Sequence, residues 1–163
     1  MNKLIRTIGI LAILLAALTF ISSCSNNTDN LDLVGEWTVS KAKTEQIDGW
    51  GDYYGHLFYP SLDATWPFRE DGTCTIADLP TSRYSISGNT LTIMASEHHE
   101  ELSHFRDTNY EIVLTIDKSN KNSVSLSGTS KMVYCTYDSY GNMGNQGNGT
   151  CKHSITLKKS SNN

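Results

Sequence analysis

Apolar and polar residues alternate along most of this chain, and no other feature of the sequence limits the possible folds as strongly. Tyr110, Ile112, Leu114 and Ile116 share one parity, and most residues of the other parity are polar or charged. Similar alternation occurs in residues 83–87, 91–93, 123–127 and 154–158. Successive side chains of a strand point to opposite faces, so a period of two indicates strands with one buried face. The sequence therefore predicts an all-β domain.

Tight turn signals separate several of these segments. Asp71-Gly72 and Gly88-Asn89 each lie between two strand-like segments. Such two-residue sequences favour β-hairpins, because glycine and asparagine tolerate the backbone angles that these turns need. We therefore predict one hairpin at each position.

Two further breaks complete the strand count. A polar stretch at residues 118–122 indicates a longer turn, and Gly128 interrupts the following run, where we expect a bend or a bulge. About eight strands then follow one another through mostly short connections, which is typical of an antiparallel meander. Closing the meander into a barrel removes both exposed edges. We predict an eight-stranded antiparallel up-and-down barrel, with a two-sheet β-sandwich as the alternative.

The N-terminal segment has the pattern of a secretory signal. Lys3 and Arg6 give it a positive start, and residues 8–21 contain no charge. This run is too short and too close to the N-terminus for an ordinary membrane span.

An aliphatic residue, two serines and Cys24 end this segment at residues 21–24. The order resembles the lipobox of bacterial lipoprotein signals. The resemblance implies that residues 1–23 are removed as a signal peptide and that Cys24 carries the lipid anchor. Residues 24–31 are then the lipidated end and a flexible tether. We expect a protein of the bacterial cell envelope, anchored by lipid at the outer membrane.

A Gly-x-Trp motif, Gly35 and Trp37, follows the tether directly. With the hairpin sequences downstream, it resembles the lipocalin-like domains of lipoproteins from Bacteroidetes. The resemblance implies a lipocalin-like barrel over residues 32–163, with Trp37 closing its base. Many lipocalins cover that tryptophan with a basic residue near the chain end, for which Lys152 and Lys158 are both candidates.

The charge of the chain argues against nucleic acid as a partner. The removed segment holds two of the 13 Lys and Arg and none of the 17 Asp and Glu, so the mature chain has a formal charge of −6. Neutralising phosphates requires clustered cations, and the sequence contains no block of Lys and Arg.

Three cysteines follow the lipobox. Cys135 and Cys151 flank a glycine-rich stretch of 15 residues, on strands that we expect to be antiparallel neighbours. An exported protein tolerates disulfides, so we predict one between these two cysteines, with two unpaired thiols as the alternative. Cys74 shares the parity of Ile76, and we expect it to be buried and free.

Residues 95–104 are rich in His and Glu. On a short helix, Glu97, Glu101 and His104 would share a face and could hold zinc. No His pair has the i, i+4 spacing of a zinc protease, so we expect a solvated acidic loop without a metal. The chain also has no nucleophile motif and no phosphate loop, and we predict neither an enzyme nor a cofactor.

Aromatic residues gather in the glycine-rich residues 48–60. We predict Trp50, Tyr53 and Tyr54 as ligand contacts, because exposed aromatic side chains present a large area at small entropic cost. The lipocalin resemblance implies the same, since the loop after the first strand forms the lid of those barrels. The alternative is that the aromatic side chains tuck under the barrel as a cap. A second loop is expected at residues 137–148.

Two functions follow from these expectations. The first is a membrane-anchored binding lipoprotein, a carrier or sensor of a small apolar or glycan-like ligand. The second is a protein-interaction or inhibitor lipoprotein that acts through its loops, with a packed barrel. The barrel interior discriminates, because an eight-stranded barrel holds either side chains or one small ligand. Four large residues lie on the parity expected to point inward: Tyr84, Tyr110, Met132 and Tyr134.

Overall fold

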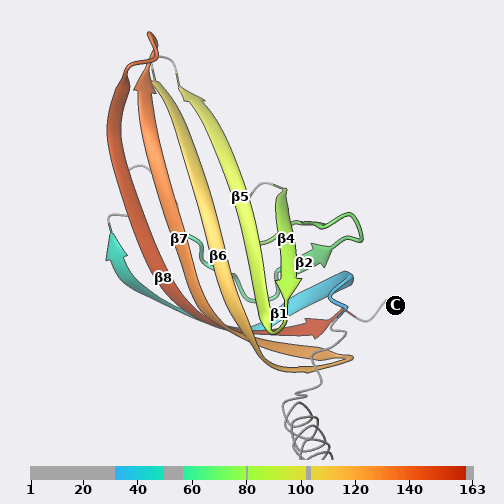
Figure 1. Cartoon of the computed structure of the whole chain (residues 1–163). Coiled ribbons are helices and arrows are strands. Elements are labelled where there is room, and N and C mark those ends of the chain that lie inside the picture. The colour runs from blue at the N-terminus through green and yellow to red at the C-terminus, as the bar shows by residue number, and fades with distance from the viewer. Residues whose placement is uncertain (1–31, 50–56, 80, 102–103, 161–163) are drawn as a thin grey trace, which may run out of the picture. The chain divides into compact units, whose positions relative to one another are not determined.

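A computed structural model describes residues 32–49, 57–79, 81–101 and 104–160 of the chain. Strands dominate this part of the protein (Figure 1). They are β1 (Gly35–Gly49), β2 (Thr65–Phe68), β3 (Thr73–Cys74), β4 (Ser82–Ser87), β5 (Thr90–Glu101), β6 (His104–Asn120), β7 (Ser123–Asp138) and β8 (Met143–Lys159). Within the described ranges, no helix is long and apolar enough to span a membrane. The fold is all-β, as the alternation predicts.

The eight strands form one closed sheet in which each strand pairs antiparallel with its neighbours in sequence and β8 pairs with β1. The β1–β8 seam runs from Trp37 opposite Lys159 to Gly49 opposite Gly149. A single closed sheet confirms the predicted up-and-down barrel and excludes the two-sheet sandwich. Strands β2, β3 and β4 are short, whereas β5–β8 continue far beyond them (Figure 1).

The predicted hairpins are present at both turn signals. Gly72 joins β2 to β3 with φ at 77°, and Gly88 joins β4 to β5 with φ at 56°, which are angles that glycine adopts without strain. The first turn is fixed by Asp71, whose Oδ1 accepts the backbone N–H of Thr73 at 2.9 Å. The turn predicted at residues 118–122 is tighter than expected, because β6 continues to Asn120 and β7 begins at Ser123.

Of the bend or bulge predicted at Gly128, the bulge is absent. The β6–β7 and β7–β8 registers run through this residue without a shift. The shift between β6 and β7 instead falls between Ile116 and Lys118. A Cβ on Gly128 would collide with the carbonyl oxygen of Val113 and lie 2.8 Å from the Cα of Leu114. Close approach of the β6 backbone therefore requires glycine at this position.

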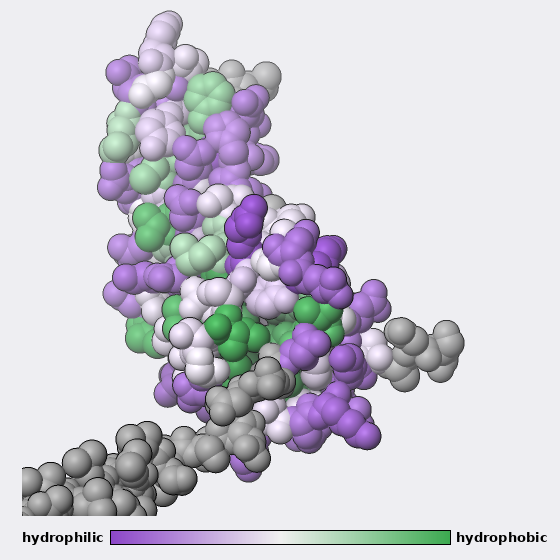
Figure 2. All heavy atoms as spheres, turned by 45° about the vertical axis from the view of Figure 1, so that its right-hand side comes forward, coloured by the Kyte–Doolittle hydropathy of each residue, from purple (hydrophilic) through white to green (hydrophobic). Residues whose placement is uncertain are grey.

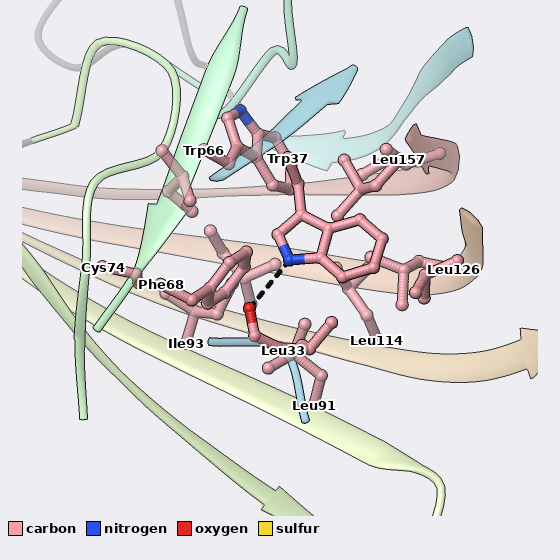
Figure 3. Packing of buried hydrophobic residues seen from close by; sticks show 14 of the residues in the cluster. Leu33, Trp37, Trp66, Phe68, Cys74, Leu91, Ile93, Leu114, Leu126 and Leu157 are labelled. Atoms are coloured by element: carbon pink, nitrogen blue, oxygen red, sulfur yellow. Dashed lines mark hydrogen bonds between the residues drawn. The ribbon is translucent and has the colours of Figure 1, made fainter. Parts of the chain in front are cut away.

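Apolar side chains fill the barrel. Trp37, Trp66 and Phe68 lie at its centre and are at most 2% exposed. Aliphatic residues of the surrounding strands pack around them, among them Leu91, Ile93, Leu114, Leu126 and Leu157 (Figure 3). At this level the interior of the barrel is packed with apolar side chains.

Trp37 is held by two contacts. Its indole N–H donates a 2.7 Å hydrogen bond to the carbonyl oxygen of Leu33 (Figure 3). The Nζ atom of Lys159 lies 5.4 Å from the centroid of the Trp37 ring, within cation–π range. The two basic residues predicted for this role, Lys152 and Lys158, are wrong, because the register places Lys159 opposite Trp37.

Beyond the short strands, β5–β8 continue as a four-stranded sheet, which we call the extension. It consists of residues 95–101 of β5, 104–110 of β6, 132–138 of β7 and 143–151 of β8. Most of both predicted loops, at residues 95–104 and 137–148, is strand. The alternation of apolar and polar residues fades in these polar, glycine-rich segments, although cross-strand pairing continues through them.

The inner face of the extension carries a second, smaller apolar cluster. Its buried members are Leu57, Ala95, Tyr110, Met132, Tyr134 and Cys151. Three of the four large residues predicted to point inward are therefore buried here, while Tyr84 is partly buried against the barrel core. On the face shown in Figure 2, hydrophobic side chains gather mainly over the barrel, and the part above it is mainly hydrophilic.

Two buried tryptophans allow a matched test of the hydrogen bond at Trp37. Trp37→Phe leaves the Leu33 carbonyl without its partner, whereas Trp66→Phe removes an N–H that has no partner in the described structure. Both changes remove similar packing. We expect Trp37→Phe to lower the free energy of unfolding by about 1–2 kcal/mol more than Trp66→Phe, measured by urea denaturation. Equal losses would show that the hydrogen bond contributes nothing.

Candidate functional site

A cavity of about 320 Å³ lies where the barrel meets the extension. One side is formed by the connections between β1 and β2 and between β3 and β4, and the other by β5 and β6. The lining residues are Leu57, Phe58, Tyr59, Ala77, Asp78, Leu79, Glu97 and Tyr110. The volume is at the lower end of the range of small-molecule sites, about 300–1,000 Å³. The cavity therefore suits a small ligand.

The described part of the aromatic cluster divides between core and cavity. Phe58 is 2% exposed and packs into the barrel core, with its ring centroid 5.9 Å from that of Trp66. Tyr59 is 49% exposed and lines the cavity. Phe58 thus covers the core, and Tyr59 lies at the exposed edge of the cavity.

The predicted lipidation site and ligand contacts lie outside the described residues. They are Cys24, Trp50, Tyr53 and Tyr54. Their roles stay predictions. Of the predicted fold motif, Gly35 begins β1, and Trp37 is in the core.

Three inward-facing residues of β6 each carry a buried polar atom without a hydrogen-bond partner in the described structure. These atoms are Arg106 Nε, Thr108 Oγ1 and the Tyr110 hydroxyl. Alternate residues of a strand share a face, so the three atoms lie along one row. Thr108 and Tyr110 are each only 1% exposed. An unpaired buried polar group costs about 1–3 kcal/mol, so three in one row are unusual. Of the three residues, Tyr110 lines the cavity.

Two opposite charges act on the Tyr110 hydroxyl at one end of this row. Burial raises the pKa of Tyr110 to about 12, with the Glu97 carboxylate acting in the same direction and the Arg106 guanidinium opposing it. Both charges therefore lie within electrostatic reach of a hydroxyl that stays protonated at neutral pH. Within the described residues, no carboxylate forms a salt bridge with Arg106. The cavity wall itself carries two carboxylates, those of Asp78 and Glu97, and two hydroxyl groups, those of Tyr59 and Tyr110.

The cavity wall also includes strained backbone. Ala77 has φ at 47°, in the left-handed region that costs a residue with a Cβ about 1–2 kcal/mol. It follows Ile76, whose side chain is fully buried in the barrel core. Strained residues persist where the surrounding structure holds them, and they cluster at functional sites.

A buried histidine lies against the ring of Phe58. His153 is 2% exposed, with Nδ1 3.0 Å from Thr44 Oγ1 and Nε2 2.7 Å from Ser130 Oγ. A hydroxyl both donates and accepts, so these partners suit either neutral tautomer. Burial lowers the pKa of His153 to about 4. Ser130 is only 3% exposed, and a threonine rather than a carboxylate faces the other ring nitrogen, so the pair lacks the orienting carboxylate of a catalytic triad.

The low pKa of His153 makes the stability of the fold depend on pH. The unfolded chain binds the proton with an ordinary pKa near 6.5, whereas the folded protein binds it only near pH 4. The stabilisation is therefore complete above pH 6.5 and is lost as the pH falls toward 4. We expect this group alone to lower the free energy of unfolding by about 2 kcal/mol between pH 7 and pH 5.

Urea denaturation of the wild type and of His153→Gln at both pH values measures this effect. Glutamine keeps one donor and one acceptor but does not titrate, so the difference between the two pH dependences isolates His153 from the surface carboxylates. Identical pH dependences for the two proteins would contradict the prediction.

The predicted disulfide between Cys135 and Cys151 is wrong, because both are free thiols. Cys135 lies opposite Gln146, whereas Cys151 lies opposite Ser130, five positions away along β7. Five strand residues span about 17 Å, far more than the 4.4–6.8 Å or so between the Cα atoms of a disulfide. Cys74 is buried and free, as predicted.

The His- and Glu-rich segment is divided between the two faces of the extension. His98 points outward, where its Nδ1 lies 2.6 Å from Asp107 Oδ1 and its ring stacks on Phe105. Glu97 lies on the opposite face, at the cavity. In the ranges that the structure describes, no group of three or more His, Cys, Asp and Glu is placed to hold a metal ion.

The fold and the cavity define a class of structure: an eight-stranded up-and-down barrel with a packed core and a small cavity beside it. The chain matches no protein-family model, and searches of the curated proteins and of the solved structures returned no match. Its function is therefore inferred from its own residues.

The sequence did not predict the row on β6. Arg106 and Thr108 were not candidates, and Tyr110 was expected only to fill the interior. The signal that points to them is a change along one parity of the strand. The inward positions pass from apolar Ile112 through Tyr110 and Thr108 to Arg106, and the period of two is retained.

Proposed function

We propose that this protein is a lipid-anchored binding lipoprotein of a bacterial cell envelope, which holds a small glycan-like ligand in the cavity beside its barrel core. One observation carries the proposal: the Tyr110 hydroxyl is buried at the wall of a 320 Å³ cavity and has no partner in the described structure. A ligand with polar groups would supply that partner. The packed core below the cavity makes the barrel a scaffold for the site.

The anchor part of the proposal is supported by the lipobox that ends at Cys24. A single acyl chain holds a protein only marginally, whereas two or three anchor it stably. Residues 24–31 would tether the barrel to the membrane without a spanning segment.

Replacing Cys24 by serine tests the anchor. A serine hydroxyl cannot form the thioether, so the protein should leave the membrane fraction and lose labelling by a radioactive fatty acid in its host. Cys135→Ser is the matched control, because Cys135 is a free thiol within the barrel domain, and that variant should remain in the membrane fraction. Unchanged fractionation of Cys24→Ser would refute the anchor.

Native mass spectrometry of the protein purified gently from its host tests the cavity. We expect an extra mass beyond that of the lipid anchor. Leu79→Trp places a larger side chain in the cavity wall and should remove this mass. Leu62→Trp is the matched control, because Leu62 is 61% exposed and does not line the cavity, and it should retain the mass. A bare protein, or a mass that survives Leu79→Trp, would contradict binding in this cavity.

A second candidate function rests on the far end of the extension. Tyr140 and Met143, at the turn between β7 and β8, are 90% and 59% exposed. Exposed apolar residues at a protruding tip suit contact with a protein partner. A packed barrel that presents this tip is the alternative if the cavity proves to hold nothing.

A further inference from the structure

We infer that the cavity binds an amino sugar, meaning a hydroxylated ring that bears a primary ammonium group. This inference rests on the proposed function and names the class of ligand. The ammonium would lie between Asp78 and Glu97, and a polar group of the ligand would reach the Tyr110 hydroxyl. Three observations lead to this chemistry: the charge of the cavity wall, the unpaired hydroxyl and the apolar surface beside them.

The charge of the cavity wall calls for a cation. Asp78 lies on the connection between β3 and β4, and Glu97 lies on β5, so the two carboxylates belong to opposite sides of the cavity. None of the described lining residues is Lys, Arg or His. Within the ranges that the structure describes, neither carboxylate forms a salt bridge. An ammonium between them would compensate both charges, which a neutral or anionic ligand would not do.

Arg106 compensates this charge only in part. Its guanidinium acts on the Tyr110 hydroxyl and lowers the pKa of that group, but Glu97 has the larger effect and raises it. Arg106 is also not among the described residues that line the cavity. The potential at the buried hydroxyl is therefore set more by the carboxylate than by the guanidinium, and it favours a positive ligand.

The Tyr110 hydroxyl calls for a ligand that forms hydrogen bonds. Tyr110 is 1% exposed, and its hydroxyl has no partner in the described structure. This oxygen can accept a hydrogen bond from an ammonium N–H or donate one to a ring hydroxyl. An apolar ligand would leave it unpaired at a cost.

A quaternary ammonium suits the cavity less well than a primary one. It has no N–H to donate, and proteins recognise it with cages of aromatic rings. Here Phe58 packs into the barrel core and Tyr110 is buried, which leaves Tyr59 as the exposed ring among the described lining residues. A primary ammonium can instead donate to Asp78, Glu97 and the Tyr110 hydroxyl.

An inorganic cation also fits poorly. Calcium and magnesium take six or more oxygen ligands. In the part of the chain that the structure describes, no group of three or more His, Cys, Asp and Glu is placed to hold a metal ion. The cavity of about 320 Å³ has the size of a site for a small organic molecule rather than for an ion.

The remaining surface of the cavity is apolar. Leu57, Phe58 and Leu79 line it, and Tyr59 adds an aromatic ring at its exposed edge. A sugar ring carries C–H groups on its faces, which pack on such surfaces while the polar groups point outward. The cavity thus combines an apolar surface for packing with a few polar groups that orient the ligand, as small-molecule sites commonly do.

The test is isothermal titration calorimetry of the full-length protein in detergent, dialysed until native mass spectrometry shows no bound mass. The probes are glucosamine and galactosamine at about pH 6.5, where an amine of this kind carries its proton. The controls are glucose and galactose, which lack the amine, and N-acetylglucosamine, which keeps the nitrogen without its charge. We expect each amino sugar to bind at least about tenfold more tightly than its neutral counterparts, the effect of one charge-assisted hydrogen bond.

Two variants test the carboxylates. Glu97→Gln should abolish the preference for amino sugars, because glutamine keeps the length of the side chain but not its charge. Asp78→Asn should weaken amino-sugar binding by only about threefold, because Asp78 is exposed and water screens its charge. Glu111→Gln is the matched control, because Glu111 follows Tyr110 on the exposed outer face of β6, and it should leave the preference unchanged.

A third variant tests the hydroxyl. Tyr110→Phe should weaken glucosamine binding about fivefold or more while leaving the unliganded protein equally or more stable, because no described hydrogen bond is lost. Tyr84→Phe is the matched control: it removes a hydroxyl bonded to the carbonyl oxygen of Arg69 at 2.9 Å, away from the cavity, and should not change binding.

The outcomes separate this inference from the proposed function. Equal affinity for amino sugars and neutral sugars, or an undiminished preference in Glu97→Gln, would overturn the amino-sugar class while a ligand site remained. Choline binding as tight as that of glucosamine would overturn it too. A native mass that Leu79→Trp removes, together with no amino-sugar binding, would refute the inference alone. No bound mass and no sugar binding would refute both.

Discussion

The unequal length of the strands is the constraint from which the rest of the structure follows. Strands β2, β3 and β4 have four, two and six residues, whereas β5–β8 have 12 to 17. A sheet can close into a barrel only at the level where all its strands are present. The barrel is therefore closed around Trp37, and beyond β4 only the longer strands continue, as the extension. The inner face of the long strands then needs a cover, which the connections carrying Phe58 and Leu79 supply. The cavity is the space left between cover and sheet.

One strand serves both parts of the molecule. The inward side chains of β6 are apolar where they face the barrel core and polar, from Tyr110 to Arg106, where the strand continues into the extension. The apolar half stabilises the fold by burial. The polar half leaves hydrogen-bonding atoms unpaired in the described structure, which lowers stability in the absence of a partner. Proteins commonly have lower stability at a binding site than the same fold would have without it.

The features that depend only on neighbouring residues could be predicted from the sequence. Alternation gave the strands of the barrel, and Gly72 and Gly88 gave its hairpins, because side-chain direction and turn angles depend on neighbouring residues alone. The extension was mistaken for loops, since there pairing between strands holds the backbone without an apolar pattern. The register between paired strands could not be predicted from neighbouring residues either. It separates Cys135 from Cys151 and places Lys159 over Trp37, and it depends on bulges in β7 and β1 that no turn signal marks.

The seam between β1 and β8 joins the two ends of the barrel domain. Trp37 meets Lys159 across it, so the first strand finds its second neighbour only when nearly the whole chain is present. Contacts between such distant residues form late, because a long loop must close before they gain anything. Until then, β1 and β8 are both open edges and the core around Trp37 lacks part of its wall. A chain shortened at its C-terminus would thus be an unsealed sheet along its full height rather than a smaller barrel.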